Sequence, residues 1–318
     1  MSDALFLVAD VGGTNTRVAL AEGGTVRPAT IARFRNRDYT GLAPIYAAYL
    51  AGQGDPACDG ACIAMAGPVM DGAGKLTNLD WSFDRDALAA CTGAPVTAIL
   101  NDLQAQGHAV PVLPRDSLIE IIPGPGPAAH TAQLVIGVGT GFNSVPVFRT
   151  ETGEYVPPCE SGHITFPQLS SDDASLARYV ARGHGFPEVE DVLSGRGLEH
   201  VYAWASGADV ARSSAEIMAA IAAGTDAVAL RAADAFCRAL GRVAGDLALT
   251  HLPFGGVFLV GGMSAAMRPY LARHGFDEAF RAKGRFSGFM SRFAVWSVAD
   301  DDAALTGCAR HAKGLLNG

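Results

Sequence analysis

The chain has 318 residues, which suits about two domains of ordinary size. Hydrophobic residues make up 49% of it and charged residues 18%, so there is enough apolar material for a sizeable buried core. The formal net charge is −8, and no run of lysines or arginines forms the basic face that a nucleic-acid-binding protein usually carries. We therefore expect no nucleic-acid partner, and the acidic balance mainly favours solubility.

The cysteines and the first residues of the chain indicate the cellular compartment in which we expect the protein. Six cysteines stand at positions 58, 62, 91, 159, 237 and 308. The opening residues, MSDALFLVADVGG, lack the basic and continuous apolar segments of a signal peptide, and no apolar stretch reaches membrane-spanning length. We expect a cytoplasmic protein with reduced thiols and no membrane partner. Only Cys58 and Cys62 are close, and no second pair at zinc-site spacing accompanies them.

The first half of the chain predicts a glycine-tipped hairpin followed by alternating strands and helices. Residues 5–9 (LFLVA) and 16–20 (TRVAL) are apolar runs joined by DVGGTN at 10–15, a pattern typical of strand, turn and strand. Further elements are expected as a helix near 42–51, strands at 61–66 and 96–100, and a helix at 103–110. Pro111 and Pro114 then interrupt the chain, and we expect a domain boundary near them.

The second half begins with a similar hairpin. Residues 133–137 and 143–148 are apolar runs that flank a turn of sequence GVGTG at 137–141. Pro146 in the second run predicts an edge strand or a bulge, because proline cannot donate to a sheet ladder.

The rest of the chain is predicted to be mainly helical. Alanine-rich helices are expected at 208–223 and 226–249, the last clear strand at 256–260, and a terminal helix at 302–316. Strands therefore alternate with helices along the chain, which predicts an α/β fold.

The two glycine turns could each bind an anion. Glycines let backbone N–H groups approach a phosphate, and small hydroxyl or amide side chains add donors. Asp10, beside the first turn, could hold Mg²⁺ directly or through water. A tight hairpin that uses the same residues only for its turn explains each motif equally well. The second turn lacks the spacing of a Rossmann fingerprint and the lysine of a Walker A loop.

Asn101 and Asp102 stand where a predicted buried strand ends and a helix begins. A sugar hydroxyl is a poor nucleophile near neutral pH, so phosphoryl transfer to it needs a carboxylate within hydrogen-bond reach to accept its proton. The carboxyl end of a strand is where α/β proteins place such groups. An ordinary helix N-cap accounts for the same two residues.

Three further motifs carry polar groups or close backbone approaches. Glu160 and His163, in the sequence ESGH, offer a carboxylate and an imidazole that suit the hydroxyls of a sugar, although a solvated loop could also carry them. Glu190, in VEDVLSG, would by default be a solvated helical residue. Residues 255–262 (GGVFLVGG) predict a buried strand whose closing glycines either admit an adenine or ribose or simply form a tight turn.

Together and in this order, the motifs resemble those of the bacterial glucokinases of the proteobacterial type, within the actin/hexokinase/Hsp70 superfamily. The resemblance covers nearly the whole chain. It is carried by residues 10–15, 66–68, 76–78, 81, 101–102, 139–141, 160–163, 192–195, 255–262 and 283–286.

The resemblance implies a fold and an activity. The fold would be two RNase H-like (actin/hexokinase-type) α/β domains flanking a central cleft, the smaller from residues 1–111 and 302–318 and the larger from 112–301. The activity would be an ATP- and Mg²⁺-dependent phosphorylation of glucose at its 6-hydroxyl, by a homodimer.

The resemblance also implies roles for particular residues. Asp102 would be the general base. The other sugar hydroxyls would be held by Asn101, Glu160, His163 and Glu190. ATP would be held by Asp10, Gly12, Gly13, Thr14, Asn15, Thr16, Gly139, Thr140, Gly141, Gly261 and Gly262, with Mg²⁺ at Asp10, directly or through water.

The chain departs from the family pattern at a few positions. Asn143 stands where a smaller residue, often glycine, is expected, Ser161 stands where glycine is expected, and Asp80 precedes Trp81 near the sugar. Two alternatives stay open: a kinase of the same fold for another hexose or amino sugar, and a non-catalytic sugar-binding sensor. The intact Asp102 speaks against the sensor, because a pure binder has no need of a base.

Overall fold

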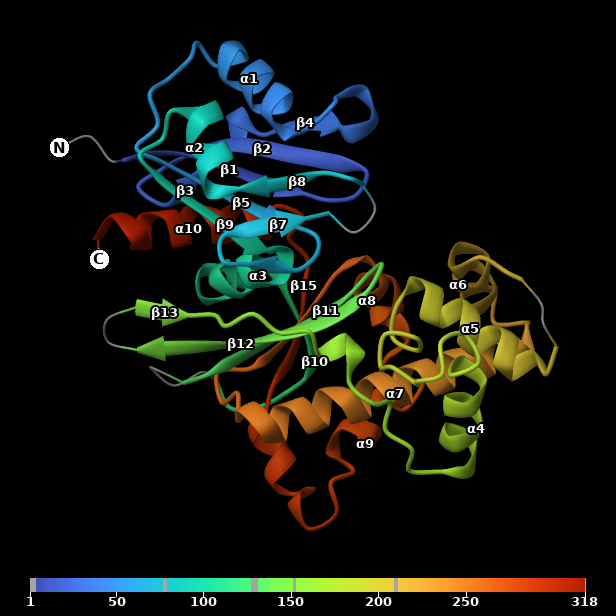
Figure 1. Ribbon diagram of the computed structural model, residues 1–318. Helices are drawn as coiled ribbons and strands as arrows, with labels where there is room; N and C mark the ends of the chain where they lie inside the picture. Colours follow the sequence, from blue (N-terminus) through green and yellow to red (C-terminus); the bar gives the residue numbers. More distant parts are fainter. Residues whose placement is uncertain (1–3, 77–78, 127–130, 151–152, 209–210, 318) are drawn as a thin grey trace. The chain divides into compact units, whose positions relative to one another are not determined.

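A computed structural model describes the chain except residues 1–3, 77–78, 127–130, 151–152, 209–210 and 318. The chain forms two compact units (Figure 1). Unit 1 comprises Met1–Leu113, Thr152–Pro158 and Asp300–Gly318, and unit 2 comprises Pro114–Glu151 and Cys159–Ala299. Thr77 and Asn78, part of one segment that carries the family resemblance, lie outside the described residues.

Unit 1 is built on a mixed sheet with strand order β3-β2-β1-β5-β9, and β4 also pairs with β2. The antiparallel pairing of β1 with β2 forms the predicted first hairpin. Strands β1, β5 and β9 run parallel to one another. The bounds are β1 (Leu5–Val11), β2 (Asn15–Glu22), β3 (Thr25–Val26), β4 (Ala32–Arg35), β5 (Gly60–Met65) and β9 (Val96–Asn101), with a separate small sheet of β6 (Val69–Met70), β7 (Ala73–Lys75) and β8 (Ser82–Asp84).

Two hydrophobic clusters cover the two faces of this sheet. Successive side chains of a strand point to opposite faces, so Leu7 and Ala9 of β1 enter one cluster and Phe6 and Val8 enter the other. The first cluster includes side chains of α1 and α2, and the second includes side chains of α3 and α10. These helices span α1 (Leu42–Gly52), α2 (Arg85–Thr92), α3 (Asp102–Ala109) and α10 (Ala303–Asn317).

A second mixed sheet has the order β10-β15-β14-β11-β12-β13, and all of its strands except β13 belong to unit 2. Strands β11 and β12 form the predicted second hairpin, and β11, β14 and β15 run parallel. Strands β10 and β15 were not predicted. The bounds are β10 (Leu118–Ile122), β11 (Gln133–Val138), β12 (Phe142–Thr150), β13 (Gly153–Tyr155), β14 (Val257–Val260) and β15 (Val295–Val298).

Pro146 lies in a regular part of β12. It lies in β12 opposite Leu134, and the register of β11 with β12 runs without a shift along the whole pairing. A bulge is absent from the pairing of β12 with β11. The strand order places β13 beyond β12, but β13 has only three residues, so the expected edge position at Pro146 stays a prediction.

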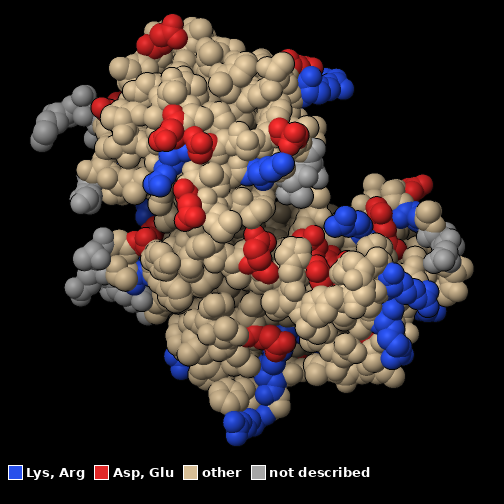
Figure 2. All heavy atoms as spheres, viewed as in Figure 1, with Lys and Arg blue, Asp and Glu red and all other residues tan. Residues whose placement is uncertain are grey.

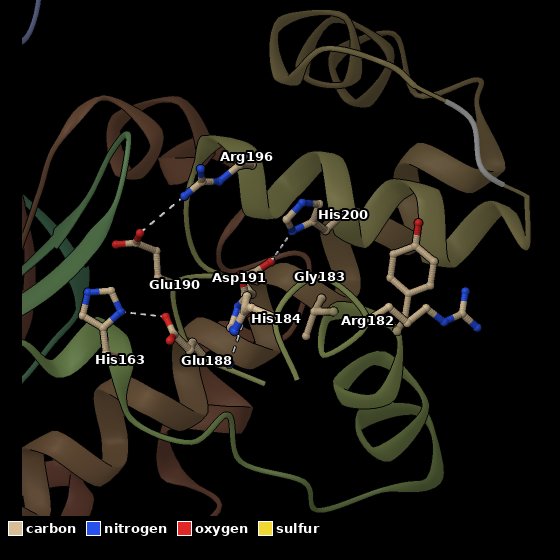
Figure 3. Close-up of a pocket in the computed structure, with 11 residues that line it drawn as sticks. His163, Arg182, Gly183, His184, Glu188, Glu190, Asp191, Arg196 and His200 are labelled. Atoms are coloured by element: carbon tan, nitrogen blue, oxygen red, sulfur yellow. Dashed lines mark hydrogen bonds and ion pairs between the residues drawn. The ribbon is translucent and has the colours of Figure 1, made fainter. Parts of the chain in front are cut away.

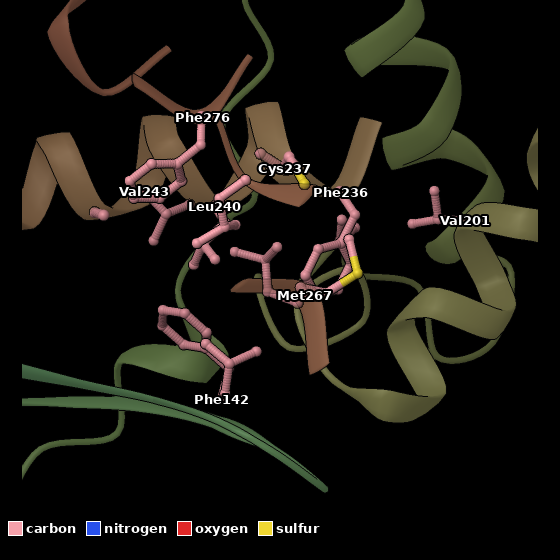
Figure 4. Close-up of a cluster of buried hydrophobic side chains, with 14 of the residues drawn as sticks. Phe142, Val201, Phe236, Cys237, Leu240, Val243, Met267 and Phe276 are labelled. Atoms are coloured by element: carbon pink, nitrogen blue, oxygen red, sulfur yellow. The ribbon is translucent and has the colours of Figure 1, made fainter. Parts of the chain in front are cut away.

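The helices of unit 2 enclose one large hydrophobic cluster. Side chains from α7 and α9 meet Phe142 of β12 and Met267 of α8 there (Figure 4). The expected helix at 208–223 is shorter than predicted, because Ser213 and Glu216 form a capping box that starts it at residue 214. The helices span α4 (Ser171–Val180), α5 (Gly195–Ser206), α6 (Ser214–Ala223), α7 (Ala227–His251), α8 (Gly262–Met267) and α9 (Phe276–Arg281).

The surface and the cysteines agree with the composition. Figure 2 shows the basic side chains of the visible face in small separate groups, with acidic side chains among them. All six cysteines are free thiols. Among the described residues, none of the helices has both the length and the apolar character needed to cross a bilayer.

One close helix contact in unit 1 holds the helix that follows Asn101. A Cβ atom at Gly307 of α10 would overlap the carbonyl oxygen of Ala105 in α3. Gly314, on the same helix, has open space at the corresponding position. Glycine at 307 therefore permits an approach of the two backbones that any other residue would prevent.

Gly307→Ala should lower the free energy of unfolding by about 2 kcal/mol, since overpacking typically costs about 1–3 kcal/mol. Gly314→Ala is the matched control and should be neutral or stabilising by up to about 1 kcal/mol, because alanine favours helix. Urea unfolding followed by circular dichroism measures both. Equal stability of the two variants would contradict the proposed contact.

Candidate active site

The first candidate group lies at the carboxyl ends of the parallel strands of unit 1. Val11 pairs with Met65, and Met65 pairs with Asn101, so the three strands end in one row. The loop after β1 and the start of α3 both follow this row. The first glycine loop and the Asn101–Asp102 pair come from separate motifs. At this edge of the sheet, only β5 lies between the strands that they follow.

Asp10 is partly buried near the end of β1. Burial raises the pKa of its carboxyl, and the nearby Arg17 cation counteracts this effect. Arg17 stands opposite Asp10 in β2, with its Nη2 3.4 Å from the Asp10 Oδ2. The same guanidinium lies 3.3 Å from the Asp302 carboxylate. A divalent cation beside Asp10 would favour its ionised form, as Arg17 does.

Asn36 holds the first glycine loop, a role that sequence reasoning missed. Its side chain is 1% exposed, with Nδ2 donating to the Gly12 carbonyl at 2.7 Å and Oδ1 accepting from the Thr16 hydroxyl at 2.9 Å. Its backbone N–H donates to the Thr14 carbonyl at 2.9 Å. Asn36 follows the short strand β4 and belongs to no recognisable motif, so local sequence carried no signal for it.

Asn101 is fixed by a capping box at the start of α3. Its Oδ1 accepts from Leu103 N at 2.9 Å, and its own N–H donates to Gln104 Oε1 at 3.1 Å. Its Nδ2 donates to the Gly67 carbonyl at 2.9 Å, and the residue is 8% exposed. The N-cap interpretation is thus correct for Asn101. Asp102 follows as the exposed first residue of α3, where the helix dipole favours a carboxylate.

The second candidate group lies at the carboxyl ends of β11 and β14 in unit 2. Gly137 pairs with Val260, so the turn at 139–141 and the glycines at 261–262 follow neighbouring strands. A Cβ atom at Gly261 would lie 2.5 Å from the Val138 carbonyl oxygen, and Gly261 has a φ of 96°, so only glycine fits. Thr140, Gly261 and Gly262 are exposed. These turns leave backbone accessible to a ligand.

Glu190 lies against the same turn instead of in a helix, so its default interpretation was wrong. Its Oε2 accepts from Phe142 N at 2.8 Å, and its backbone N–H donates to the Gly162 carbonyl at 2.9 Å. A Cβ atom at Gly141 would lie 2.5 Å from that Oε2, so the glycine makes room for the carboxylate. Arg196 Nη2 lies 3.6 Å from the other oxygen (Figure 3).

Glu160 and His163 flank a short 3-10 helix at Ser161–His163. His163 Nδ1 is hydrogen-bonded to Glu188 Oε2 at 2.6 Å (Figure 3). This bond raises the pKa of His163, burial opposes it, and the charges of Glu188, Glu190 and Glu160 add to the rise. Partial burial also raises the pKa of Glu160, with His163 counteracting and Glu190 reinforcing the effect. Because Glu188 bonds Nδ1, it does not occupy Nε2 of the imidazole, which can bond a ligand.

A cavity in unit 2 adjoins these side chains. It has a volume of about 670 Å³, and His163, Glu188, Glu190 and Arg196 are among the residues that line it (Figure 3). Small-molecule sites usually measure roughly 300–1,000 Å³ and carry a few convergent polar groups. His163 and Glu190, predicted from two motifs of unit 2, therefore line one cavity of suitable size.

Comparison with known proteins assigns the chain to a family. A model of the family described as Glucokinase matches residues 7–315. The chain belongs to the glucokinase family. It is 33% identical over 307 residues to the glucokinase of Marinobacter nauticus, an alignment that covers 95% of each chain.

Solved structures agree with this assignment. The structure of glucokinase from an Antarctic psychrotroph is 30% identical, with a TM-score of 0.86 and coverage of 97% of this chain and 98% of that one. Glucokinase from Balamuthia mandrillaris, solved with glucose, has the same fold at 21% identity, with a TM-score of 0.82 and coverage of 98% and 94%. The predicted family, the α/β fold of actin/hexokinase type and the class of ATP-dependent glucokinase are therefore confirmed.

One cluster beside the cavity has the residue types of a metal site. Ligand atoms of His184, Glu188 and Asp191 lie within 4.8 Å of one another. These groups already bond protein partners, since His184 Nε2 lies 2.9 Å from Asp191 Oδ2 and Glu188 holds His163. We assign no metal to this cluster.

Glu188→Gln should lower the pKa of His163, because it removes the carboxylate that stabilises the imidazolium. His163 would then lose its proton at a lower pH than in the parent protein. Imidazole NMR titration, with His163→Gln for assignment, measures the change. Glu199→Gln is the control, since Glu199 bonds Ser214 N and does not influence His163. An unchanged or raised pKa in Glu188→Gln would refute this account of the pair.

Proposed function

We propose that this protein transfers the γ-phosphoryl group of MgATP to the 6-hydroxyl of glucose, with Asp102 as the general base. The position of Asp102 is the observation that carries the proposal. It is an exposed carboxylate on the first residue of α3, directly after a buried strand, and its neighbour Asn101 is held by three hydrogen bonds. Membership of the glucokinase family supports glucose as the acceptor and disfavours the two alternatives.

The base has a simple task in this reaction. The attacking hydroxyl must lose its proton as the bond to phosphorus forms, and a carboxylate within about 2.6–3.2 Å can accept it. The start of α3 favours the ionised form of Asp102 through the helix dipole. The capping box fixes the backbone beneath Asp102, so little freedom must be lost when the sugar binds.

The remaining sugar hydroxyls would be held by Asn101, Glu160, His163 and Glu190. Carboxylates accept hydrogen bonds, and an imidazole or amide can donate them. This set can therefore accept the hydrogen of a sugar hydroxyl and donate to its oxygen. The hydrogen bonds of Glu190 to Phe142 and of His163 to Glu188 support the proposal, because they orient both side chains before a ligand binds.

The nucleotide would be held by loop residues of three glycine motifs. They are Asp10, Gly12, Gly13, Thr14, Asn15, Thr16, Gly139, Thr140, Gly141, Gly261 and Gly262. A Cβ atom at Gly262 would meet no atom within 4 Å, and one at Gly139 only Gly262 N at 3.9 Å, so the glycine backbone stays open to phosphate or ribose.

Mg²⁺ fits the residues present at the first loop. Asp10 supplies the carboxylate oxygen that Mg²⁺ prefers, and its burial makes a nearby cation favourable. When bound, Mg²⁺ neutralises charge on the phosphates being transferred. Asp10 would hold the ion directly or through water.

Three further features belong to the proposal. The two compact units would serve as the small domain, residues 1–111 with 302–318, and the large domain, residues 112–301. The protein would act in the cytoplasm, in keeping with its free thiols. It would assemble as a homodimer, which light scattering of the purified protein tests.

Asp102→Ala should lower kcat by at least about 100-fold, the low end for loss of a general base, while the Kd for glucose changes little. Asp172→Ala is the matched control, because Asp172 is also an exposed carboxylate in the first turn of a helix. A coupled assay gives kcat, and calorimetry gives the Kd. Near-normal turnover in Asp102→Ala would remove Asp102 from the role of base.

A further inference from the structure

Asn143 connects the second glycine turn to the turn that carries Glu160 and His163. It is the second residue of β12, directly after the turn at 139–141. Its Nδ2 donates to the Cys159 carbonyl, and its Oδ1 accepts from Ser161 N at 3.0 Å. One side chain therefore bonds the backbone on both sides of Glu160.

A hydroxyl pair reinforces this connection. Ser161 Oγ lies 3.3 Å from Asn143 Oδ1 and 2.7 Å from Ser144 Oγ. Ser144 is 0% exposed and Ser161 is 4% exposed. Hydrogen bonds shielded from water are stronger than exposed ones, and each partner left unsatisfied costs free energy.

The same short segment of β12 also contacts the third candidate sugar residue. Phe142 N donates to Glu190, and the Phe142 carbonyl would overlap a Cβ atom at Gly162. Residues 142–144 therefore set the relative positions of Glu160, His163 and Glu190 within unit 2. A shift of the 160–163 turn would move two of these three groups away from the third.

Asn143 and Ser161 are also positions where the resemblance leads one to expect small residues, often glycine. Glycine at both would remove every hydrogen bond described above that the Asn143 and Ser161 side chains make, and would leave the Cys159 carbonyl without that donor. Compared with a chain that has glycine at both positions, this protein has additional hydrogen bonds between β12 and the turn that carries Glu160 and His163.

We propose that Asn143, together with Ser161, is a positioning residue that fixes the Glu160–His163 turn against β12 and thereby sets the affinity for glucose. The inference rests on the proposed function, since it concerns the sugar side of that site. Asn143 acts through the turn and does not itself touch the reacting atoms.

Asn143→Gly should raise the KM and the Kd for glucose by about tenfold, the effect of losing one to two buried hydrogen bonds, and change kcat by less than about threefold. The KM for MgATP should stay within about twofold, because the turn at 139–141 keeps its own backbone bonds. Steady-state kinetics and glucose calorimetry without nucleotide measure these constants.

Companion variants separate positioning from general stability. Asn143→Asp keeps the acceptor for Ser161 N but places an oxygen in repulsive contact with the Cys159 carbonyl, so its Kd should rise at least as much as that of Asn143→Gly. Adding Ser161→Gly to Asn143→Gly should cost less than the product of the single effects, because the two residues bond each other. Ser175→Ala, which loses a hydrogen bond to Trp204 elsewhere in unit 2, should leave both constants unchanged.

Each outcome bears on a different claim. A folded Asn143→Gly protein with parental KM and Kd for glucose, in an enzyme that phosphorylates glucose, would overturn this inference alone. A parent protein that neither binds nor phosphorylates glucose would overturn the proposed function and the inference with it. If Asn143→Gly fails to fold, Asn143→Asp and Ser161→Ala decide the matter, and parental glucose constants in both would overturn the inference.

Discussion

In-register pairing of parallel strands determines where the candidate phosphate loops and Asn101–Asp102 of this protein lie. In unit 1 the pairing places Val11, Met65 and Asn101 in one row. In unit 2 it places Gly137 beside Val260. Loops that follow strands of the same row must emerge at the same edge of the sheet, so motifs far apart in the chain meet there.

In the proposed function, the loops at these edges would bind phosphate through backbone N–H groups more than through charged side chains. Net charge is −8, and the candidate phosphate loops contain glycine, threonine and asparagine, without lysine. Phosphoryl transfer depends mainly on positioning and on stabilising charge, which oriented N–H groups and one metal ion can supply. Glycine is required at Gly261 by positive φ and at Gly141 by the adjacent Glu190 carboxylate. In the proposed site, the same glycines would also expose backbone to the nucleotide.

Local signals predicted the parts of the fold that depend on neighbouring residues. The two hairpins and the start of α3 follow from turn and capping preferences, which act over a few residues. Strand β15 was missed because a run of only four residues, VWSV, does not distinguish strand from helix. The position of Glu190 was also missed, because it depends on Phe142, 48 residues earlier in the chain. Asn143 and Ser161 stood out as departures, but only the fold reveals that they bond each other.

Phosphorylation of glucose by MgATP is the central claim, and a sugar panel tests it most directly. The purified protein would be assayed with MgATP and glucose, mannose, fructose, N-acetylglucosamine or no sugar, and the product identified by phosphorus NMR. The account predicts strong turnover with glucose, glucose 6-phosphate as product, and negligible ATP consumption without sugar. Preference for another sugar, or glucose binding without turnover, would contradict it.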